Sequence, residues 1–269
     1  MIPYYDAHTH LNDPKLYPDR ATIINQFHTK GGQWLTIIGL DTMSSQLAID
    51  ICDEYVDHPV AVRATIGVHP CFVHDRPDQS DFSHLFDTLV AMSQHPHVVG
   101  IGECGTDLHY PTTPVQHQLQ KDLFAIQCEV AKATRLPLVI HSRDDWEGTM
   151  DVLCMYPDLP IYMHCWWYTS EQYDRLSHHT EQLRIGLCGN VTYPKATGLH
   201  EMARCIADRH LLIETDAPYL APQDIRWQTN TSAYIPSIYQ AIARLRGVDE
   251  SVLAQHVGAN WTRLYTRDG

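Results

Sequence analysis

The sequence is poor in basic residues. Nineteen Lys and Arg stand against 32 Asp and Glu in 269 residues, so the formal net charge is −13. Proteins that coat duplex nucleic acid depend on many Lys and Arg to displace counterions. The composition therefore excludes a broad basic face of that kind, although it permits a small cleft that binds a few phosphates.

Long apolar segments and linkers are also missing. No run approaches the roughly 18 consecutive apolar residues of a membrane helix, and the N-terminus lacks the basic-then-apolar pattern of a signal peptide. We therefore expect a soluble, cytoplasmic protein with neither a membrane partner nor an obligate protein partner. No Ser/Gly-rich linker or internal repeat divides the chain, which predicts a single domain over residues 1–269.

Cysteine pairs with metal-site spacing are absent too. The eight cysteines are scattered without a CxxC pair, which predicts reduced, mostly buried side chains. Histidine, by contrast, is frequent, with 18 copies. Those in polar or helical stretches are predicted to lie on the surface: His28, His58, His84, His95, His178, His179 and His210.

Short apolar runs alternate with amphipathic stretches along the chain, which predicts βα units and a parallel sheet. After a first strand that opens the chain, the predicted strands are 34–39, 60–70, 98–103, 138–141, 161–164, 184–187 and 211–216. About eight strands in a chain of this length favour an α/β fold of the TIM (β/α)8 barrel type. An open doubly wound sheet is disfavoured because no glycine-rich loop follows the first strand.

The motif DAHTHL at residues 6–11 carries two candidate metal ligands. Residues two apart on a strand point to the same side, so His8 and His10 project together. Alone, the pair is equally compatible with an ordinary half-buried strand.

Further ligand-type residues follow other predicted strands, at the end where a barrel gathers its active site. Four imidazoles and two carboxylates suit a pair of borderline ions such as zinc and are too nitrogen-rich for a dedicated magnesium or calcium site. One carboxylate must bridge two ions, and Glu103 can place one oxygen on each. The predicted metal ligands are His8, His10, Glu103, His141, His164 and Asp216.

Seven motifs in this order resemble the TatD family of metal-dependent hydrolases. They are DAHTHL (6–11), GVHP (67–70), GECGTD (102–107), HSRD (141–144), HC (164–165), GNVTY (189–193) and ETDAPYL (214–220). The resemblance covers nearly the whole chain. It implies a metallo-dependent hydrolase barrel related to amidohydrolases, and a deoxyribonuclease acting from DNA 3′ ends. It also implies one ion on His8, His10 and Asp216 with Glu103, and a second on Glu103, His141 and His164.

Hydrolysis by metal-activated water follows from two such ions, with zinc expected and magnesium or manganese as the other possibilities. Asp216 would orient the water and take its proton, with Glu103 as the second catalytic carboxylate. The resemblance implies that His69 contacts a substrate phosphate or assists the leaving group; the alternative is a histidine bonded to backbone. Arg143 is expected to bind a phosphate, with an ion pair to Asp144 or another loop carboxylate as the alternative.

Several segments depart from the family pattern. Cys104 and Thr106 replace aliphatic residues beside Glu103 and Asp107, which should alter packing only. Trp166, Trp167 and Tyr168 form an aromatic patch that predicts either base stacking or lid and core packing. The family's RNEP-like segment is only loosely matched at 226–232, which places substrate specificity in question.

The leading hypothesis is a dinuclear hydrolase of phosphodiesters at DNA or RNA ends. In a second hypothesis, an enzyme with the same metal ions hydrolyses an ester or amide, including the aminoacyl ester of a tRNA. A third is a metal-stabilised scaffold without catalysis, for which each ion should be closed by four protein ligands.

Overall fold

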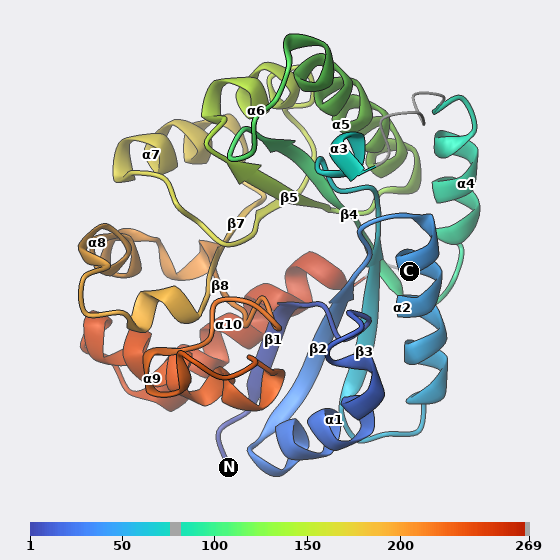
Figure 1. The fold of residues 1–269 in the computed structure, drawn as a ribbon. Coiled ribbons are helices and arrows are strands. Elements are labelled where there is room, and N and C mark those ends of the chain that lie inside the picture. The colour runs from blue at the N-terminus through green and yellow to red at the C-terminus, as the bar shows by residue number, and fades with distance from the viewer. Residues whose placement is uncertain (76–81, 267–269) are drawn as a thin grey trace.

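The computed structural model describes residues 1–75 and 82–266. Over this part of the chain, eight parallel strands follow one another around a nearly closed barrel, in sequence order (Figure 1). The strands are β1 (Tyr4–Thr9), β2 (Gly32–Ile38), β3 (Ala61–Ile66), β4 (Val98–Asp107), β5 (Leu138–Arg143), β6 (Ile161–Met163), β7 (Leu183–Leu187) and β8 (Leu211–Ile213). The predicted (β/α)8 barrel is thus confirmed.

Helices stand around the strands, as Figure 1 shows. In the described residues they are α1 (Arg20–Thr29), α2 (Thr42–Glu54), α3 (Phe72–Asp75), α4 (Leu85–Met92), α5 (Pro114–Thr134), α6 (Trp146–Leu153), α7 (Ser170–His179), α8 (Thr197–Cys205), α9 (Ile235–Arg246) and α10 (Glu250–Tyr265). Short 3-10 turns are η1 (Tyr17–Asp19), η2 (Gly189–Thr192), η3 (Asp208–His210), η4 (Gln223–Ile225) and η5 (Ser232–Tyr234). None of the helices in the described ranges is both long and apolar enough to span a bilayer.

Four predicted strand ends were misplaced by two residues or more. The third strand ends at Ile66, so His69 lies in the loop beyond it, and the eighth ends at Ile213 rather than Asp216. The fourth runs on to Asp107 and the fifth to Arg143, because residues 104–107 pair with 140–143. Hydrophobic runs show where a strand is buried, whereas pairing with the neighbouring strand decides where it ends.

Several helices begin at side-chain caps that the sequence encodes locally. Asp41, Thr113 and Thr169 each accept a hydrogen bond from the backbone N–H three residues on, and that third residue bonds back to the cap. These capping boxes satisfy amide groups that the first turn of a helix leaves without partners. The loops that precede α2, α5 and α7 at the barrel mouth are therefore anchored where they enter a helix.

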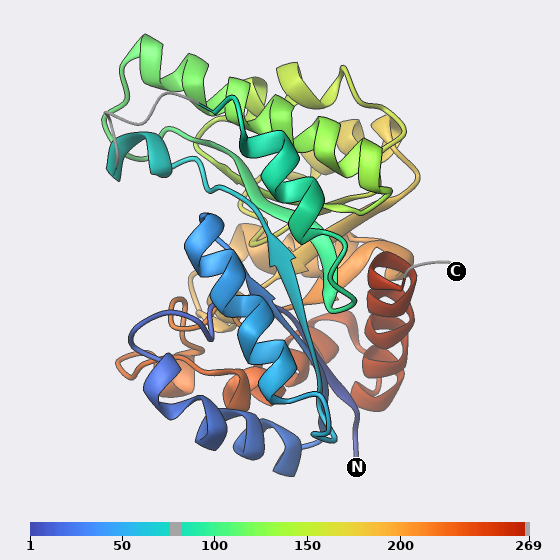
Figure 2. The ribbon, with the colours of Figure 1, turned by 90° about the vertical axis from the view of Figure 1, so that its right-hand side faces the viewer.

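The last helix, α10, closes the end of the barrel where the strands begin. Trp261 donates to the hydroxyl of Thr36 at 3.2 Å, and the Asn260 amide donates to the carbonyl of Leu211, the first residue of β8, at 2.9 Å. Figure 2 shows α10 on the opposite side of the barrel from α3. The carboxyl ends of the strands are left to the βα loops.

Closure between the last and first strands occurs at the carboxyl end. Asp216 N donates to the His8 carbonyl at 2.9 Å, and His10 N donates to the Ala217 carbonyl at 2.8 Å. The buried Asp6 carboxylate accepts from the backbone N–H of Thr215 at 2.9 Å and from its hydroxyl at 2.7 Å. These bonds hold the segment after β8 against β1.

One histidine expected on the surface is in the core. His210 is 1% exposed, and its Nδ1 lies 2.9 Å from the Tyr173 hydroxyl, while Nε2 has no hydrogen-bond partner among the described residues. Burial, with the nearby charges of Arg209 and Arg184, lowers the pKa of His210 to about 4. Its polar sequence neighbours concealed the fact that it ends the turn leading into β8.

His210 should make stability depend on pH. Between pH 6.5 and about 4 the unfolded chain protonates this ring and the folded chain does not, so its contribution to the free energy of unfolding falls as the pH falls. We expect His210→Gln to lose less stability than the wild type between pH 7 and pH 5 in urea unfolding. His178→Gln, on the surface, is the control. Equal slopes for all three proteins would contradict the assignment.

Candidate metal centre

His8 and His10 project into the barrel mouth from the end of β1. His8 is the penultimate residue of the strand, and the closing bonds described above hold the segment that carries His10 beside Ala217. The two Nε2 atoms lie 3.3 Å apart, and both rings are buried. The shared orientation predicted from the HxH spacing is therefore present, and the ordinary-strand alternative does not account for the converging nitrogens.

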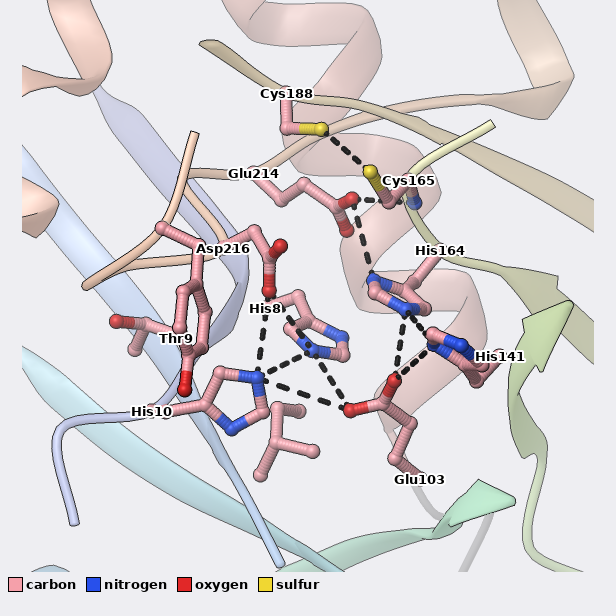
Figure 3. A network of polar contacts seen from close by, with 12 residues as sticks. His8, Thr9, His10, Glu103, His141, His164, Cys165, Cys188, Glu214 and Asp216 are labelled. Carbon is pink, nitrogen blue, oxygen red and sulfur yellow. Dashed lines mark hydrogen bonds and ion pairs between the residues drawn. The ribbon is translucent and has the colours of Figure 1, made fainter. Parts of the chain in front are cut away.

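Glu103, on β4, lies between two pairs of histidines (Figure 3). Its Oε2 is 3.3 Å from Nε2 of His8 and 3.8 Å from Nε2 of His10. Its Oε1 is 2.9 Å from Nδ1 of His141 and 2.8 Å from Nε2 of His164. Each oxygen thus faces a different pair of rings, as a bridging carboxylate requires.

Asp216, after β8, lies beside the first histidine pair, His8 and His10. Its Oδ1 is 3.3 Å from Nε2 of His10 and 3.7 Å from Nε2 of His8. The residue has φ of 53°, in the left-handed region where a non-glycine residue costs roughly 1–3 kcal/mol. The bonds between its backbone and the His8 carbonyl and Tyr219 N–H hold it there.

The charges of this cluster are strongly coupled. Burial alone would raise the pKa of the Glu103 carboxyl, but His164, His69 and His8 and a hydrogen bond to His141 hold it well below its ordinary value. Burial opposes protonation of His164, yet Glu103 and Glu214 raise its pKa well above the usual value. Glu103 is therefore an anion that needs cationic partners.

The donor set fits divalent ions. The ring nitrogens of His8 and His10 and a carboxylate oxygen of Glu103 lie within 4.8 Å of one another, close enough to hold one ion. His69, Glu103 and His141 form a second group of this kind. In each set imidazole nitrogens point at one another and at a buried carboxylate, an arrangement that a cation between them satisfies better than hydrogen bonds alone.

Two carboxylates support the rings from behind. Asp107 Oδ2 lies 3.0 Å from Nε2 of His141, on the side away from Glu103. Glu214 is 3.6 Å from Nδ1 of His164 and accepts from Cys165 N at 2.6 Å and from the Tyr162 hydroxyl. A partner at hydrogen-bond distance, as Asp107 is, fixes the orientation of a ligating histidine, whereas Glu214 acts on His164 through its charge. Glu214, inside the ETDAPYL motif, was not among the predicted site residues.

His69 bonds to backbone, as one of its two predictions had it, but it also faces the Glu103 cluster. Its Nδ1 accepts from the backbone N–H of Cys71 at 3.1 Å, while its Nε2 lies 3.5 Å from Oε1 of Glu103. Burial lowers the pKa of His69 to about 3, with the charge of His141 acting in the same direction. The ring is thus neutral and borders the cluster.

Arg143 ends β5, two residues after His141 and so on the same side of the strand. In the described residues Arg143 forms no ion pair with Asp144, whose carboxylate lies 3.1 Å from His109. Among residues 1–75 and 82–266, no carboxylate pairs with the Arg143 guanidinium. It is half-buried at the barrel mouth and available to an anion.

The aromatic patch after His164 is mainly packing. Trp166 is buried against Trp146 and Tyr168 at ring distances of 6.0 and 5.5 Å, so base stacking on it is excluded. The Tyr168 hydroxyl bonds to Ser142 at 2.7 Å, and only Trp167 is substantially exposed, at 51%.

The cysteines are free thiols, as expected. Five are buried, Cys71 is half-buried, and Cys154 and Cys205 are exposed. Cys165 and Cys188 have Sγ atoms 3.0 Å apart behind His164, a proximity that the separated positions in the sequence did not reveal.

A parallel barrel that gathers histidines and carboxylates where its strands end is an arrangement suited to metal-dependent hydrolysis. The model of the TatD related DNase family matches residues 5–266, so the chain belongs to that family. The 3′-5′ ssDNA/RNA exonuclease TatD of Salmonella typhimurium is 31% identical over 97% of this chain and 98% of its own.

Other relatives carry broader names. An uncharacterized metal-dependent hydrolase of Mycoplasma genitalium is 27% identical over 98% of this chain and 99% of its own. A solved TatD homolog from Escherichia coli superposes with a TM-score of 0.85 at 22% identity, covering 97% of both chains, which supports the fold.

The Asp107 contact predicts a selective loss of metal affinity. Asp107→Asn removes the anion that orients His141, so we expect metal to bind 10- to 100-fold more weakly, about the usual effect of such partners. Titration of metal-stripped protein, followed by calorimetry, measures this. The control is Asp144→Asn, which alters a neighbouring exposed carboxylate. Unchanged affinity in Asp107→Asn would rule out an orienting role.

Proposed function

We propose that the protein is a dinuclear phosphodiesterase that removes nucleotides from the 3′ ends of single-stranded DNA or RNA. The observation that carries this proposal is the Glu103 carboxylate, whose two oxygens face two separate histidine pairs. A single buried carboxylate arranged in this way is suited to bridging two cations.

One ion would be held by His8, His10, Asp216 and Oε2 of Glu103. The other would be held by Nδ1 of His141, Nε2 of His164 and Oε1 of Glu103. The predominance of imidazole nitrogen favours zinc, with manganese or magnesium as substitutes. Two divalent ions in such a site activate water for attack and neutralise charge on the substrate oxygen. The second ion, with three protein ligands, would keep a coordination position for water or substrate, unlike a closed structural site.

The chain's own residues would then position substrate and move protons. Asp216 can accept the proton of the attacking water on a carboxylate oxygen, since burial is outweighed by His10, His164 and His8, which keep its pKa below the ordinary value. Arg143 would bind a phosphate oxygen of the substrate. Neutral His69 would lie beside the leaving group.

The nucleic-acid substrate is supported by the name of the Salmonella relative, a 3′-5′ ssDNA/RNA exonuclease with 31% identity. A cytoplasmic location would bring the enzyme to such ends. The acyl-ester alternative uses the same ions and is separated from this proposal by substrate tests.

Replacing the bridge should remove metal and activity together. We expect metal-loaded wild type to contain close to two ions per chain by elemental analysis and to degrade a 3′-ended single-stranded oligonucleotide. Glu103→Ala should retain at most one ion and lose at least about 100-fold in kcat, the order of a lost electrostatic stabiliser. Glu201→Ala, an exposed acid on α8, is the matched control.

Other outcomes of that experiment are equally informative. Hydrolysis of an aminoacyl ester but not of the oligonucleotide would refute the phosphodiesterase and retain the metal site. A wild type that binds no divalent transition metal would refute the site itself.

Arg143 tests the phosphate contact directly. Loss of a hydrogen bond to a charged group costs about 1.5–3 kcal/mol, so we expect Arg143→Ala to lower kcat/KM for a phosphodiester about 10- to 150-fold. Hydrolysis of a neutral carboxyl ester should not change, and neither should either activity in Arg204→Ala, on the exposed face of α8. An equal loss on both substrates would mean that Arg143 supports the site rather than the phosphate.

A further inference from the structure

The loop that follows β8 carries a tryptophan that the fold does not use. Trp227 is 93% exposed, although burial of a large aromatic ring would be strongly favourable. Isolated exposed apolar residues are common and need no explanation. The surroundings of Trp227, however, distinguish it from an isolated ring.

Arg226 lies against two aromatic rings. Its guanidinium carbon is 4.3 Å from the ring centroid of Tyr193 and 5.5 Å from that of Trp227. Tyr193 is itself fixed, because its hydroxyl donates to the Ala221 carbonyl at 2.9 Å. Among the described residues, no acceptor or carboxylate engages the Arg226 side chain, so its N–H groups remain free for an anion.

Both ends of this loop are tied to the metal centre. Tyr219 N donates to the Asp216 carbonyl at 2.9 Å, and the Tyr219 ring lies 6.0 Å from that of His10. The buried Asn230 amide donates to the carbonyls of Thr215 at 2.9 Å and Tyr219 at 2.7 Å. Trp227 is three residues from Asn230, so its Cα lies within roughly 11 Å of that anchor.

We propose that Trp227 and Arg226 form a strand-binding subsite at the rim of the metal centre. An unpaired base of the substrate stacks on the Trp227 ring, while Arg226, held flat by Tyr193, bonds to a phosphate of the same strand. This inference rests on the proposed nuclease function and adds to it a source of affinity a few nucleotides from the reacting bond. Paired bases cannot stack in this way, so the subsite selects single strands.

Kinetics with three phosphodiesters test the stacking. Metal-loaded wild type, Trp227→Ala and Trp227→Phe are compared on oligothymidylate, on an abasic strand of equal length and on bis(p-nitrophenyl) phosphate. We expect Trp227→Ala to raise KM for oligothymidylate about 5- to 150-fold, the range for loss of one stacking ring, with kcat nearly unchanged. Trp227→Phe should restore most of the affinity, and the two substrates without bases should show no change.

The proposed phosphate contact of Arg226 is tested by the salt dependence of KM. The measured quantity is the slope of log KM for oligothymidylate against log salt concentration. Arg226→Gln should make this slope smaller in magnitude by about 0.7, the amount for one phosphate contact on a single strand. The abasic strand should show the same reduction, because it retains the phosphates. Met155→Ala, which removes a 61% exposed apolar side chain in the loop before β6, should leave every value unchanged.

Three results would overturn the subsite. Equal KM values for wild type and Trp227→Ala on oligothymidylate would do so. A rise in KM for the abasic strand as large as the rise for oligothymidylate would do so as well. A change in molecular mass by light scattering without a change in KM would make the ring a protein-docking residue instead.

Failure of the nuclease proposal can be distinguished from failure of the subsite. If the wild type cleaves no phosphodiester, anisotropy of dye-labelled oligothymidylate measures binding directly. Weaker binding by Trp227→Ala would then support the subsite, and unchanged binding would overturn it.

Discussion

A single buried carboxylate organises this molecule. Glu103 is 2% exposed, and five histidines, His8, His10, His69, His141 and His164, place a ring nitrogen within 3.8 Å of its oxygens. An anion removed from water in this way must be compensated by cations or hydrogen-bond donors. The barrel meets this requirement by drawing side chains from strand ends that are far apart in the sequence. The same requirement makes the centre suitable for metal ions.

The position of each ligand depends on bonds in the backbone behind it. Asp216 reaches the first histidine pair because Asp6 binds Thr215, and because the chain after β8 pairs with the end of β1. Asp107 holds the His141 ring from behind at 3.0 Å, and the Glu214 carboxylate lies 3.6 Å behind His164. Closure of the barrel and the placement of Asp216 beside the first histidine pair therefore depend on the same interactions. A substitution that loosens β1 from β8 would act on the metal centre without touching a ligand.

Alternation of apolar runs with amphipathic stretches was enough to predict the barrel, because strands buried on both faces give continuous apolar runs and helices buried on one face give amphipathic stretches. It also predicted that His8, His141 and Asp216 would meet, since parallel strands end at one edge. The pattern could not locate the end of β4, which depends on pairing with β5, or the burial of His210, which lies among polar neighbours. Nor could it show that Trp166 packs inward while Trp227 points outward. These features depend on tertiary contacts, which cannot be deduced from the spacing of residues in the sequence.

The net charge of −13 is compatible with a polyanionic substrate if affinity is concentrated at a few points. Long-range attraction to nucleic acid is weak in such a protein, because most of its surface repels phosphate. Arg143 and Arg226 have no carboxylate partner among the described residues, and Lys15 lies 6.0 Å from the ring of Tyr219, next to His10. In the proposed function these cationic groups, at the end of β5 and on the loops around the candidate metal centre, would each contact one phosphate. If the protein acts as proposed, recognition of this kind favours the end of a flexible single strand over a duplex, which needs a wide basic face. The acidity of the protein would then contribute to selectivity rather than oppose the proposed activity.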